Sequence, residues 1–261
     1  MQGLQQLRAR VLRPLRAAWR LLRCAVHVLH GMVIAVLLFP RYGAAERHAR
    51  IRWWASKMLA VLGVSLRMQG TPAVGASLLV ANHISWLDIL AIHAVLPHAR
   101  FVSKADVKAW PLLSHLVEAG GTLYLERERK RDALRVVHAM AEALQAGETV
   151  AVFPEGTTSD GRALLPFHAN LLQAAIATGT AVQPVALRFS DSSDAFSRAV
   201  EFVGDTTLVQ SLWRVVCGQR ITANVDLLAP HASAHHERRA LAQALRDDIA
   251  MQLQRSGPPR G

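Results

Sequence analysis

His83 and Asp88 stand five positions apart, where a β-prone run gives way to a helical pattern. Ser85 and Asp88 have the spacing of a capping box, so we expect Ser85 at the N-cap and Asp88 in the first turn of a helix. Side chains five residues apart on a continuous helix diverge by about 140°, but a first-turn carboxylate can lean back toward a residue before the cap. Asp88 is therefore expected to reach the imidazole of His83.

Such a pair can perform general-base chemistry. A carboxylate on one ring nitrogen fixes the tautomer, leaves the other nitrogen free to take a proton from an alcohol, and stabilises the imidazolium that forms. The nucleophile would then be a hydroxyl of the substrate. In the alternative interpretation Asp88 only caps a helix and His83 is an ordinary loop residue, so the remaining sequence has to decide between the two.

Charge and hydropathy point to an anionic, lipid-like partner. The 261 residues include 30 Lys+Arg against 19 Asp+Glu, a net charge of +11, and 51% of the residues are hydrophobic. Phospholipid headgroups and nucleic acid both fit the charge, but the hydropathy favours a membrane surface and no nucleic acid. Cys24 and Cys217 lack disulfide or metal-site spacing, and we expect both to be buried and reduced.

Residues 1–62 are expected to form a helical membrane anchor. Arginines alternate with apolar residues over 4–23, and an apolar run follows from Cys24 to Phe39. As a helix this run reaches only about 24 Å, less than the roughly 30 Å hydrocarbon core, and basic residues flank both sides. We therefore expect a monotopic hairpin, with a turn at 40–43 and a second limb over 44–62.

Three other interpretations of this segment remain open: a single helix that spans a tilted or thinned bilayer, ordinary core helices, and a cleaved signal peptide. The last is disfavoured because Arg41 follows the apolar run directly. Either membrane interpretation places the protein at the cytoplasmic face of the cell's inner membrane, as a monotopic or single-pass protein.

Residues 63–261 are expected to form one catalytic domain. Short β-prone runs alternate with helical stretches, which is typical of an α/β fold with a mostly parallel central sheet flanked by helices. The predicted strands are 77–81, 100–103, 122–125, 149–153, 182–189, 200–203 and 221–228. The predicted helices are near 86–95, 109–118, 130–146, 167–178, 206–216 and 235–254.

Four motifs occur in order along this domain. They are Asn82-His83-Ile84-Ser85-Trp86-Leu87-Asp88, Gly121-Thr122-Leu123-Tyr124-Leu125-Glu126-Arg127, Phe153-Pro154-Glu155-Gly156-Thr157-Thr158-Ser159 and Val182-Gln183-Pro184-Val185-Ala186. Their order and spacing, over about residues 64–190, resemble the 1-acylglycerol-3-phosphate acyltransferase (lysophospholipid acyltransferase) family. The resemblance implies transfer of a fatty acyl group to the free hydroxyl of a lysolipid, with lysophosphatidic acid as the first candidate acceptor and phosphatidic acid as the product.

The resemblance also implies roles for individual residues. His83 and Asp88 would be the catalytic dyad, and Arg127 would hold the acidic group of the acceptor. Residues 155–158, that is Glu155, Gly156, Thr157 and Thr158, would bind the acceptor, and Pro184 would line the active-site wall or the acyl route. A guanidinium suits a phosphate because it binds bidentately, although Arg127 could instead pair with a neighbouring glutamate.

One position departs from the family pattern. The arginine that usually follows Pro-Glu-Gly-Thr is replaced here by Thr158. If that arginine normally contacts phosphate, a less anionic acceptor such as a lyso-ornithine lipid becomes an alternative, or Arg162 or His168 supplies the charge.

The implied reaction needs no cofactor and no metal. The donor would be an acyl carrier protein (acyl-ACP) or coenzyme A (acyl-CoA) thioester, and backbone amides near Ser85 or Gly156 would stabilise the oxyanion. His231, His235 and His236 lack a matching ligand set for zinc. A Gly-x-Ser-x-Gly elbow is missing, which disfavours a serine hydrolase. A non-enzymatic basic module that binds membrane or nucleic acid would use the arginines without His83.

Overall fold

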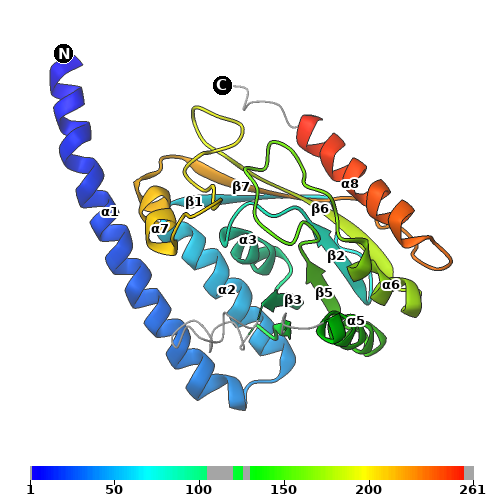
Figure 1. Cartoon of the computed structure of the whole chain (residues 1–261). Helices are drawn as coiled ribbons and strands as arrows, with labels where there is room; N and C mark the ends of the chain where they lie inside the picture. The colour runs from blue at the N-terminus through cyan, green and yellow to red at the C-terminus, as the bar shows by residue number, and fades with distance from the viewer. Residues whose placement is uncertain (1, 105–119, 126–129, 256–261) are drawn as a thin grey trace.

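The computed structural model describes residues 2–104, 120–125 and 130–255 (Figure 1). Seven strands in this part of the chain form one sheet in the order β1-β7-β6-β2-β5-β3-β4. They are β1 Val64–Gln69, β2 Ser77–Ala81, β3 Ala99–Lys104, β4 Leu123–Leu125, β5 Thr149–Val152, β6 Ala181–Ser190 and β7 Ile221–Leu227. Every neighbouring pair is parallel except β6 and β7. The predicted α/β fold with a mostly parallel sheet is confirmed.

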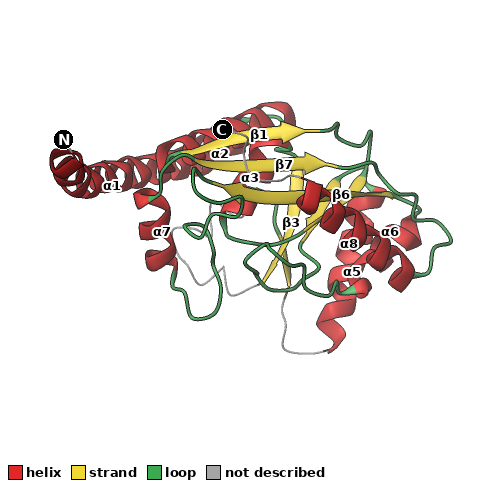
Figure 2. Cartoon of the chain, turned by 90° about the horizontal axis from the view of Figure 1, so that it is seen from above, coloured by secondary structure: helices red, strands yellow, loops and turns green. Residues whose placement is uncertain are grey.

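Helices cover both faces of the sheet (Figures 1 and 2). One face carries α1, α2, α3 and α7, and the other carries α5, α6 and α8. Their bounds are α1 Gln2–Val33, α2 Ala44–Leu62, α3 Leu87–Val95, α5 Lys130–Gln145, α6 Gln173–Thr178, α7 Leu208–Cys217 and α8 Arg238–Arg255. The described residues also form a short π-helix, η1 Ile34–Leu38, and two short 3-10 helices, η2 Phe39–Arg41 and η4 Ala169–Leu172.

Strand β2 lies at the centre of the sheet, between β6 and β5. All five of its residues are buried, because side chains of successive residues enter opposite faces of a sheet covered on both sides. Leu79 and Ala81 join the core beneath α2 and α3, whereas Leu78 and Val80 join the core beneath α5 and α6. This central strand fixes the position at which His83 leaves the sheet.

Two strand assignments needed correction. Residues 200–203, predicted as a strand, are turn and irregular backbone: Val200 is buried in the core, and the segment pairs with none of the described strands. Strand β1 was missed because its edge position leaves most of its residues exposed, so the sequence lacks a buried apolar run there. The helix predicted near 109–118 lies outside the described residues.

The N-terminal segment forms the predicted helical hairpin, with α1 and α2 joined through η1 and η2 (Figure 1). His27 Nε2 lies 3.0 Å from the carbonyl oxygen of Trp54, and Trp54 Nε1 donates to the His27 carbonyl at 3.1 Å. The two rings stack with centroids 5.4 Å apart. Gly31 makes room for this contact, because a Cβ there would lie 2.2 Å from Trp54 Nε1. The hairpin is thus bonded together near its closed end.

The first limb is one continuous helical stretch. Residues 13–41 form one helical stretch of 29 residues with a mean hydropathy of 2.1 in its most apolar window, long and apolar enough to cross a membrane by length and composition. The apolar run 24–39 continues the helix that contains the arginines before Cys24, as the helical pattern over 4–23 had indicated. More than half of each of seven side chains on one face is exposed: Leu15, Trp19, Leu22, Val26, Leu29, Val33 and Val36.

Helix α1 also packs on the domain. Ala17 is fully buried in the same core as Leu59 and Leu62 of α2. Arg20 Nη1 donates to the carbonyl oxygens of Val216 and Gly218 at 2.8 and 2.9 Å, which binds α1 to the end of α7. Cys24 and Cys217 are free and only partly buried, because both lie where these helices meet rather than in the core as expected.

Candidate active site

His83 and Asp88 form a hydrogen-bonded pair at the carboxyl end of β2. The distance from His83 Nδ1 to Asp88 Oδ2 is 2.7 Å. The Asp88 side chain is fully buried, while that of His83 remains 20% exposed. An ionised carboxylate can only accept, so Nδ1 carries the proton and Nε2 keeps a lone pair. The geometry is that of an oriented general base that solvent or substrate can reach.

The local backbone explains why Asp88 can turn back toward His83. Asp88 Oδ2 also accepts from the amides of Ile84 at 2.6 Å and Ser85 at 2.9 Å. The carboxylate thus forms the reciprocal half of the predicted capping box. The other half is displaced, since α3 begins at Leu87 and the Ser85 hydroxyl faces the Leu87 amide at 3.4 Å instead of the amide of Asp88.

Glu155 connects the turn after β5 to the histidine loop. Its Oε1 accepts from the His83 amide at 2.8 Å, and its Oε2 accepts from the Leu165 amide at 2.9 Å. Burial raises the pKa of Glu155 above its ordinary value, and these two amides oppose that rise. Both oxygens face backbone amides, so in this structure Glu155 positions the backbone of His83.

Three further residues hold His83 in place, and the sequence analysis assigned no role to them. The Ser159 amide donates to the His83 carbonyl at 2.8 Å. The Phe153 ring stacks on the imidazole with centroids 4.0 Å apart. The Asn82 carboxamide exchanges two hydrogen bonds with the backbone of Leu187, which substitutes for the strand pairing that ends at β2. All three lie within the sequence motifs that contain His83 and Glu155, and this location was the only feature of the sequence that could have indicated their role.

The other residues predicted to bind substrate are placed as follows. Gly156 adopts a left-handed conformation, φ 69°, and its amide donates to the Phe153 carbonyl at 3.1 Å in a tight turn. Thr157 is exposed beside this turn. The Thr158 hydroxyl donates to the carbonyl oxygen of Phe202. Arg127 lies outside the described residues.

Pro184 occupies the middle of β6, in register with Val80 of β2. It is buried and shares the strand face of Val182, which belongs to the core beneath α5 and α6. The His83 ring lies against Phe153, which packs with the core on the opposite face. Pro184 is therefore on the other side of the sheet from the imidazole.

The two suggested replacements for the family's arginine point elsewhere. Arg162 Nη2 donates to Asp194 Oδ2 at 2.8 Å and to the Phe196 carbonyl at 2.9 Å, so its charge is already paired. His168 is exposed and lines a groove beside α8. Neither guanidinium nor imidazole is directed at His83.

The backbone amides expected to stabilise an oxyanion are engaged. The amide of Ser85 is bonded to Asp88, and that of Gly156 to the Phe153 carbonyl. The next amide in the exposed turn, that of Thr157, has no hydrogen bond within the described part of the chain. It lies beside the glutamate that holds the His83 backbone, which makes it the better placed donor.

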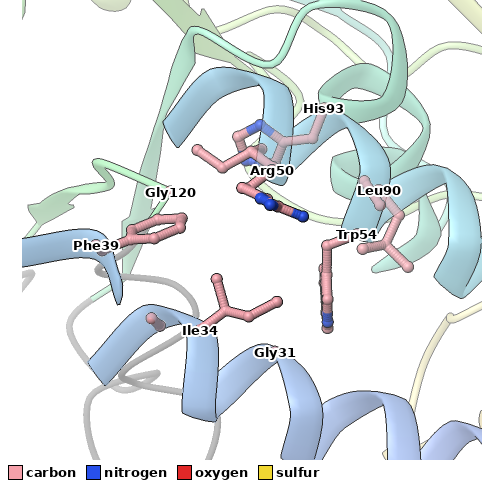
Figure 3. Close-up of a pocket in the computed structure, with 11 residues that line it drawn as sticks. Gly31, Ile34, Phe39, Arg50, Trp54, Leu90, His93 and Gly120 are labelled. Atoms are coloured by element: carbon pink, nitrogen blue, oxygen red, sulfur yellow. The ribbon is translucent and has the colours of Figure 1, made fainter. Parts of the chain in front are cut away.

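An apolar cavity of about 60 Å³ lies between α1, α2 and α3 (Figure 3). Its lining includes Ile34, Trp54 and Leu90, together with the side chains of Arg50 and His93. His93 Nδ1 is buried and has no partner among the described residues. Burial lowers the pKa of His93 to about 4, and His98 adds to the shift. The cavity lining contains neither His83 nor Asp88, so it is separate from the dyad.

Comparison with known proteins identifies relatives of the whole chain. The acyltransferase family profile matches residues 66–188. A lyso-ornithine lipid O-acyltransferase from Pseudomonas aeruginosa is 36% identical over 85% of this chain and 87% of its own length. A 1-acyl-sn-glycerol-3-phosphate acyltransferase from Neisseria meningitidis is 38% identical over 74% of each chain. The crystal structure of a 1-acyl-sn-glycerophosphate acyltransferase from Thermotoga maritima shares the fold, with a TM-score of 0.70 over 95% of this chain and 97% of that one, at 17% identity.

The fold and these relatives define the protein as an α/β acyltransferase of the lysolipid type. The chain belongs to the 1-acylglycerol-3-phosphate acyltransferase family, as the order of its motifs had indicated.

Proposed function

We propose that the protein acylates the free hydroxyl of 1-acyl-sn-glycerol-3-phosphate with a thioester-bound fatty acid, giving phosphatidic acid, and that His83 is the general base. The observation that carries this proposal is the 2.7 Å bond between His83 Nδ1 and the buried Asp88, which leaves Nε2 free. The acceptor supplies the nucleophile, so the enzyme needs no acylated residue and no cofactor.

The step balances as follows. The lysolipid oxygen attacks the thioester carbonyl carbon while its proton moves to His83 Nε2, and Asp88 stabilises the imidazolium. The tetrahedral oxyanion faces backbone donors, for which the Thr157 amide is the candidate. Collapse forms the new ester bond and breaks the C–S bond, and the departing thiolate takes the proton back from His83. The products are the diacyl lipid and a free thiol.

A lyso-ornithine lipid is a second candidate acceptor. Two observations favour it: Thr158 stands where the family usually has arginine, with its hydroxyl bound to Phe202, and Arg162 is paired with Asp194. The first leaves out a positive charge that the family usually has, and the second neutralises a positive charge that could have replaced it. The Pseudomonas aeruginosa relative is named for this activity, which supports the candidate.

The exposed apolar face of α1 supports membrane attachment at the cytoplasmic face. Arginines interleave with this face at the N-terminal end, where anionic headgroups would neutralise them. Lysolipid and product both reside in the bilayer, so attachment there keeps the acceptor close to His83. The hairpin bonded through His27 and Trp54 favours insertion into one leaflet.

The test is acyl transfer by purified protein in mixed micelles. Lysophosphatidic acid and lyso-ornithine lipid would be offered in parallel, with acyl carrier protein and coenzyme A carrying the same labelled acyl chain. Loss of the general base should lower kcat by about a hundred- to ten-thousandfold in His83→Ala, without loss of folding. His138→Ala is the matched control, because that histidine is 79% exposed on α5.

The outcomes separate the candidates. Phosphatidic acid as the product supports the first acceptor, and acylation of lyso-ornithine lipid alone supports the second. Absence of transfer to either acceptor from either donor contradicts the proposed function. A His83→Ala enzyme as active as the wild type contradicts the assigned base.

A further inference from the structure

A second hollow in the molecule, unlike the apolar cavity of Figure 3, is open and strongly basic. It is a groove of about 640 Å³ between α8 and the loop that precedes α6. Ten residues line it: Pro166, Phe167, His168, Ala169, Asn170, Arg238, Arg239, Ala242, Gln243 and Arg246. Three are arginines, one is a histidine, and none is acidic. We call this surface the α8 groove.

The positive charge of the α8 groove is available to a partner. Arg238 and Arg239 are exposed, and within the described part of the chain neither forms an ion pair. The adjacent Glu237 turns to the helix backbone, where its Oε2 accepts from the Ala240 amide at 2.8 Å. Asp247, one turn beyond the groove, accepts from the Gln243 carboxamide. The bond to the Ala240 amide lowers the pKa of Glu237, and Arg239 and Arg238 contribute to this lowering electrostatically. The hydrogen bond of Glu237 nevertheless goes to the backbone and Asp247 bonds an amide group, so neither carboxylate forms a described ion pair with these guanidiniums.

One hydrogen-bonded loop links the α8 groove to the active site. Arg246 at its upper end donates to the carbonyl oxygens of Leu164 and Leu165 at 2.6 and 3.1 Å. The amide of Leu165 in turn binds Glu155, the residue that holds the His83 backbone. On the opposite wall the His168 amide donates to the Pro154 carbonyl at 2.8 Å. One loop, residues 154–168, thus borders both places.

The groove also lies away from the membrane-binding face. In Figures 1 and 2, α8 lies on the side of the sheet opposite α1, whose apolar face we expect to contact the bilayer. A lipid in the bilayer would therefore not reach Arg238 and Arg239, but a water-soluble protein would. Three arginines and an open shape suit an acidic, water-soluble partner better than an acyl chain.

We infer that the α8 groove is the docking surface for the acyl donor, and that the donor is an acyl carrier protein whose acidic helix binds Arg238 and Arg239. This inference rests on the proposed function and adds the donor to it. Complementary charge between exposed surfaces increases the rate of encounter and decreases with ionic strength. The thioester would then enter along the loop that ends at Glu155.

The test compares two donors that carry the same acyl chain, acyl carrier protein and coenzyme A, on the full-length enzyme in mixed micelles. Arg238→Glu/Arg239→Glu should raise KM for the carrier protein about tenfold at low salt and leave its kcat unchanged. Added NaCl should raise the wild-type KM and have little effect on the variant. KM and kcat with acyl coenzyme A should stay within about twofold of the wild type, which also confirms folding.

Arg67→Glu/Arg255→Glu is the matched control. It makes the same change of charge at exposed arginines on β1 and at the far end of α8, and it should leave both donors unaffected. A milder variant, Arg238→Gln/Arg239→Gln, should change KM for the carrier protein in the same direction by a smaller factor.

Four results would overturn the inference. In Arg238→Glu/Arg239→Glu, KM could rise equally for both donors, rise for acyl coenzyme A alone, or stay unchanged for both. As the fourth result, the wild type could accept acyl groups from coenzyme A alone. Loss of binding to anionic vesicles with unchanged donor kinetics would instead mark the groove as a lipid contact. Absence of transfer from either donor by the wild type is a different failure, which contradicts the proposed function rather than the docking surface.

Discussion

Around His83 most polar atoms are held by hydrogen bonds, although the buried Asp88 Oδ1 has no partner among the described residues, whereas apolar side chains along one face of the N-terminal helix are more than half exposed. Asp88 Oδ2 accepts three hydrogen bonds, and both oxygens of Glu155 are occupied by amides. The seven apolar side chains from Leu15 to Val36 on α1 have no such constraint. The first region fixes the position of His83 Nε2, and the second is the surface through which we propose that the protein attaches to the membrane.

This difference separates two kinds of effect. Changes at the bonded end of β2 should lower kcat while the protein still binds membranes. Changes on the exposed face of α1 should weaken membrane binding while the chemistry is retained. The variants below test whether the two effects are independent.

Asp88→Asn should have the largest effect. The asparagine can still accept from the amides of Ile84 and Ser85, but its NH₂ group no longer fixes the productive tautomer of His83. We expect kcat to fall about a thousandfold, with vesicle binding unchanged. Steady-state kinetics and vesicle flotation would measure both, with Asp205→Asn in an exposed loop as the control. A loss of vesicle binding equal to the loss of kcat would contradict the separation.

Leu22→Ser/Leu29→Ser should weaken membrane binding without changing the chemistry. Each side chain is a little over half exposed and loses about 1 kcal/mol of transfer free energy, so partition into vesicles should fall about thirtyfold. With a short-chain acceptor in solution, kcat should match the wild type. The control, Leu134→Ser/Met251→Ser, removes exposed apolar groups from α5 and α8 and should bind vesicles normally. Equal binding by both double variants would show that α1 is not the anchor.

Glu155→Gln should give an intermediate effect on catalysis. A carboxamide oxygen can serve only one of the two amides, so either His83 or Leu165 faces an NH₂ group. We expect kcat to decrease about tenfold for both candidate acceptors, with little change in either KM, because the residue acts through the position of His83. Glu142→Gln, at an exposed site on α5, is the control. An increase in one acceptor's KM alone would show that Glu155 contacts that acceptor.

His93→Leu should change the pH dependence of stability and little else. The folded pKa of His93, about 4, lies below the ordinary value of 6.5, so the unfolded chain binds the extra proton first. The wild type should therefore lose stability as pH falls from 6.5 to 4, by up to about 3 kcal/mol, and the variant should lose less. Urea unfolding at several pH values measures this slope. His138→Leu is the exposed control, and an identical slope in His93→Leu would exclude His93 as the source.

The sequence predicted best what is local. The contact between His83 and Asp88 depends on one helix start, and the buried strand Ser77–Ala81 is readable because all its residues are apolar or small. Contacts made across the chain could not be predicted in this way. Glu155 finds its second amide at Leu165 in a loop that has no periodic pattern, and the α8 groove joins residues about seventy positions apart.

The errors have physical causes too. The packing of α1 on the domain could not be predicted from a hydropathy profile, because it depends on contacts across the chain such as those of Arg20 with the carbonyl oxygens of Val216 and Gly218. Residues 200–203 have the β-prone composition of a strand, with Glu201 among apolar neighbours, but the Phe202 amide donates to the Ile84 carbonyl and the Phe202 carbonyl accepts from Thr158, which are isolated bonds rather than a ladder.

The paired bonds between His27 and Trp54 have a mechanical consequence. They join α1 to α2, and α2 packs along α3, the helix that carries Asp88. In the proposed membrane attachment, the height of His83 above the bilayer surface is then set by the protein's own structure rather than by the reach of a flexible linker. Activity should accordingly depend on how deep in the leaflet the acceptor's hydroxyl lies, so that headgroup size and bilayer thickness become determinants of turnover.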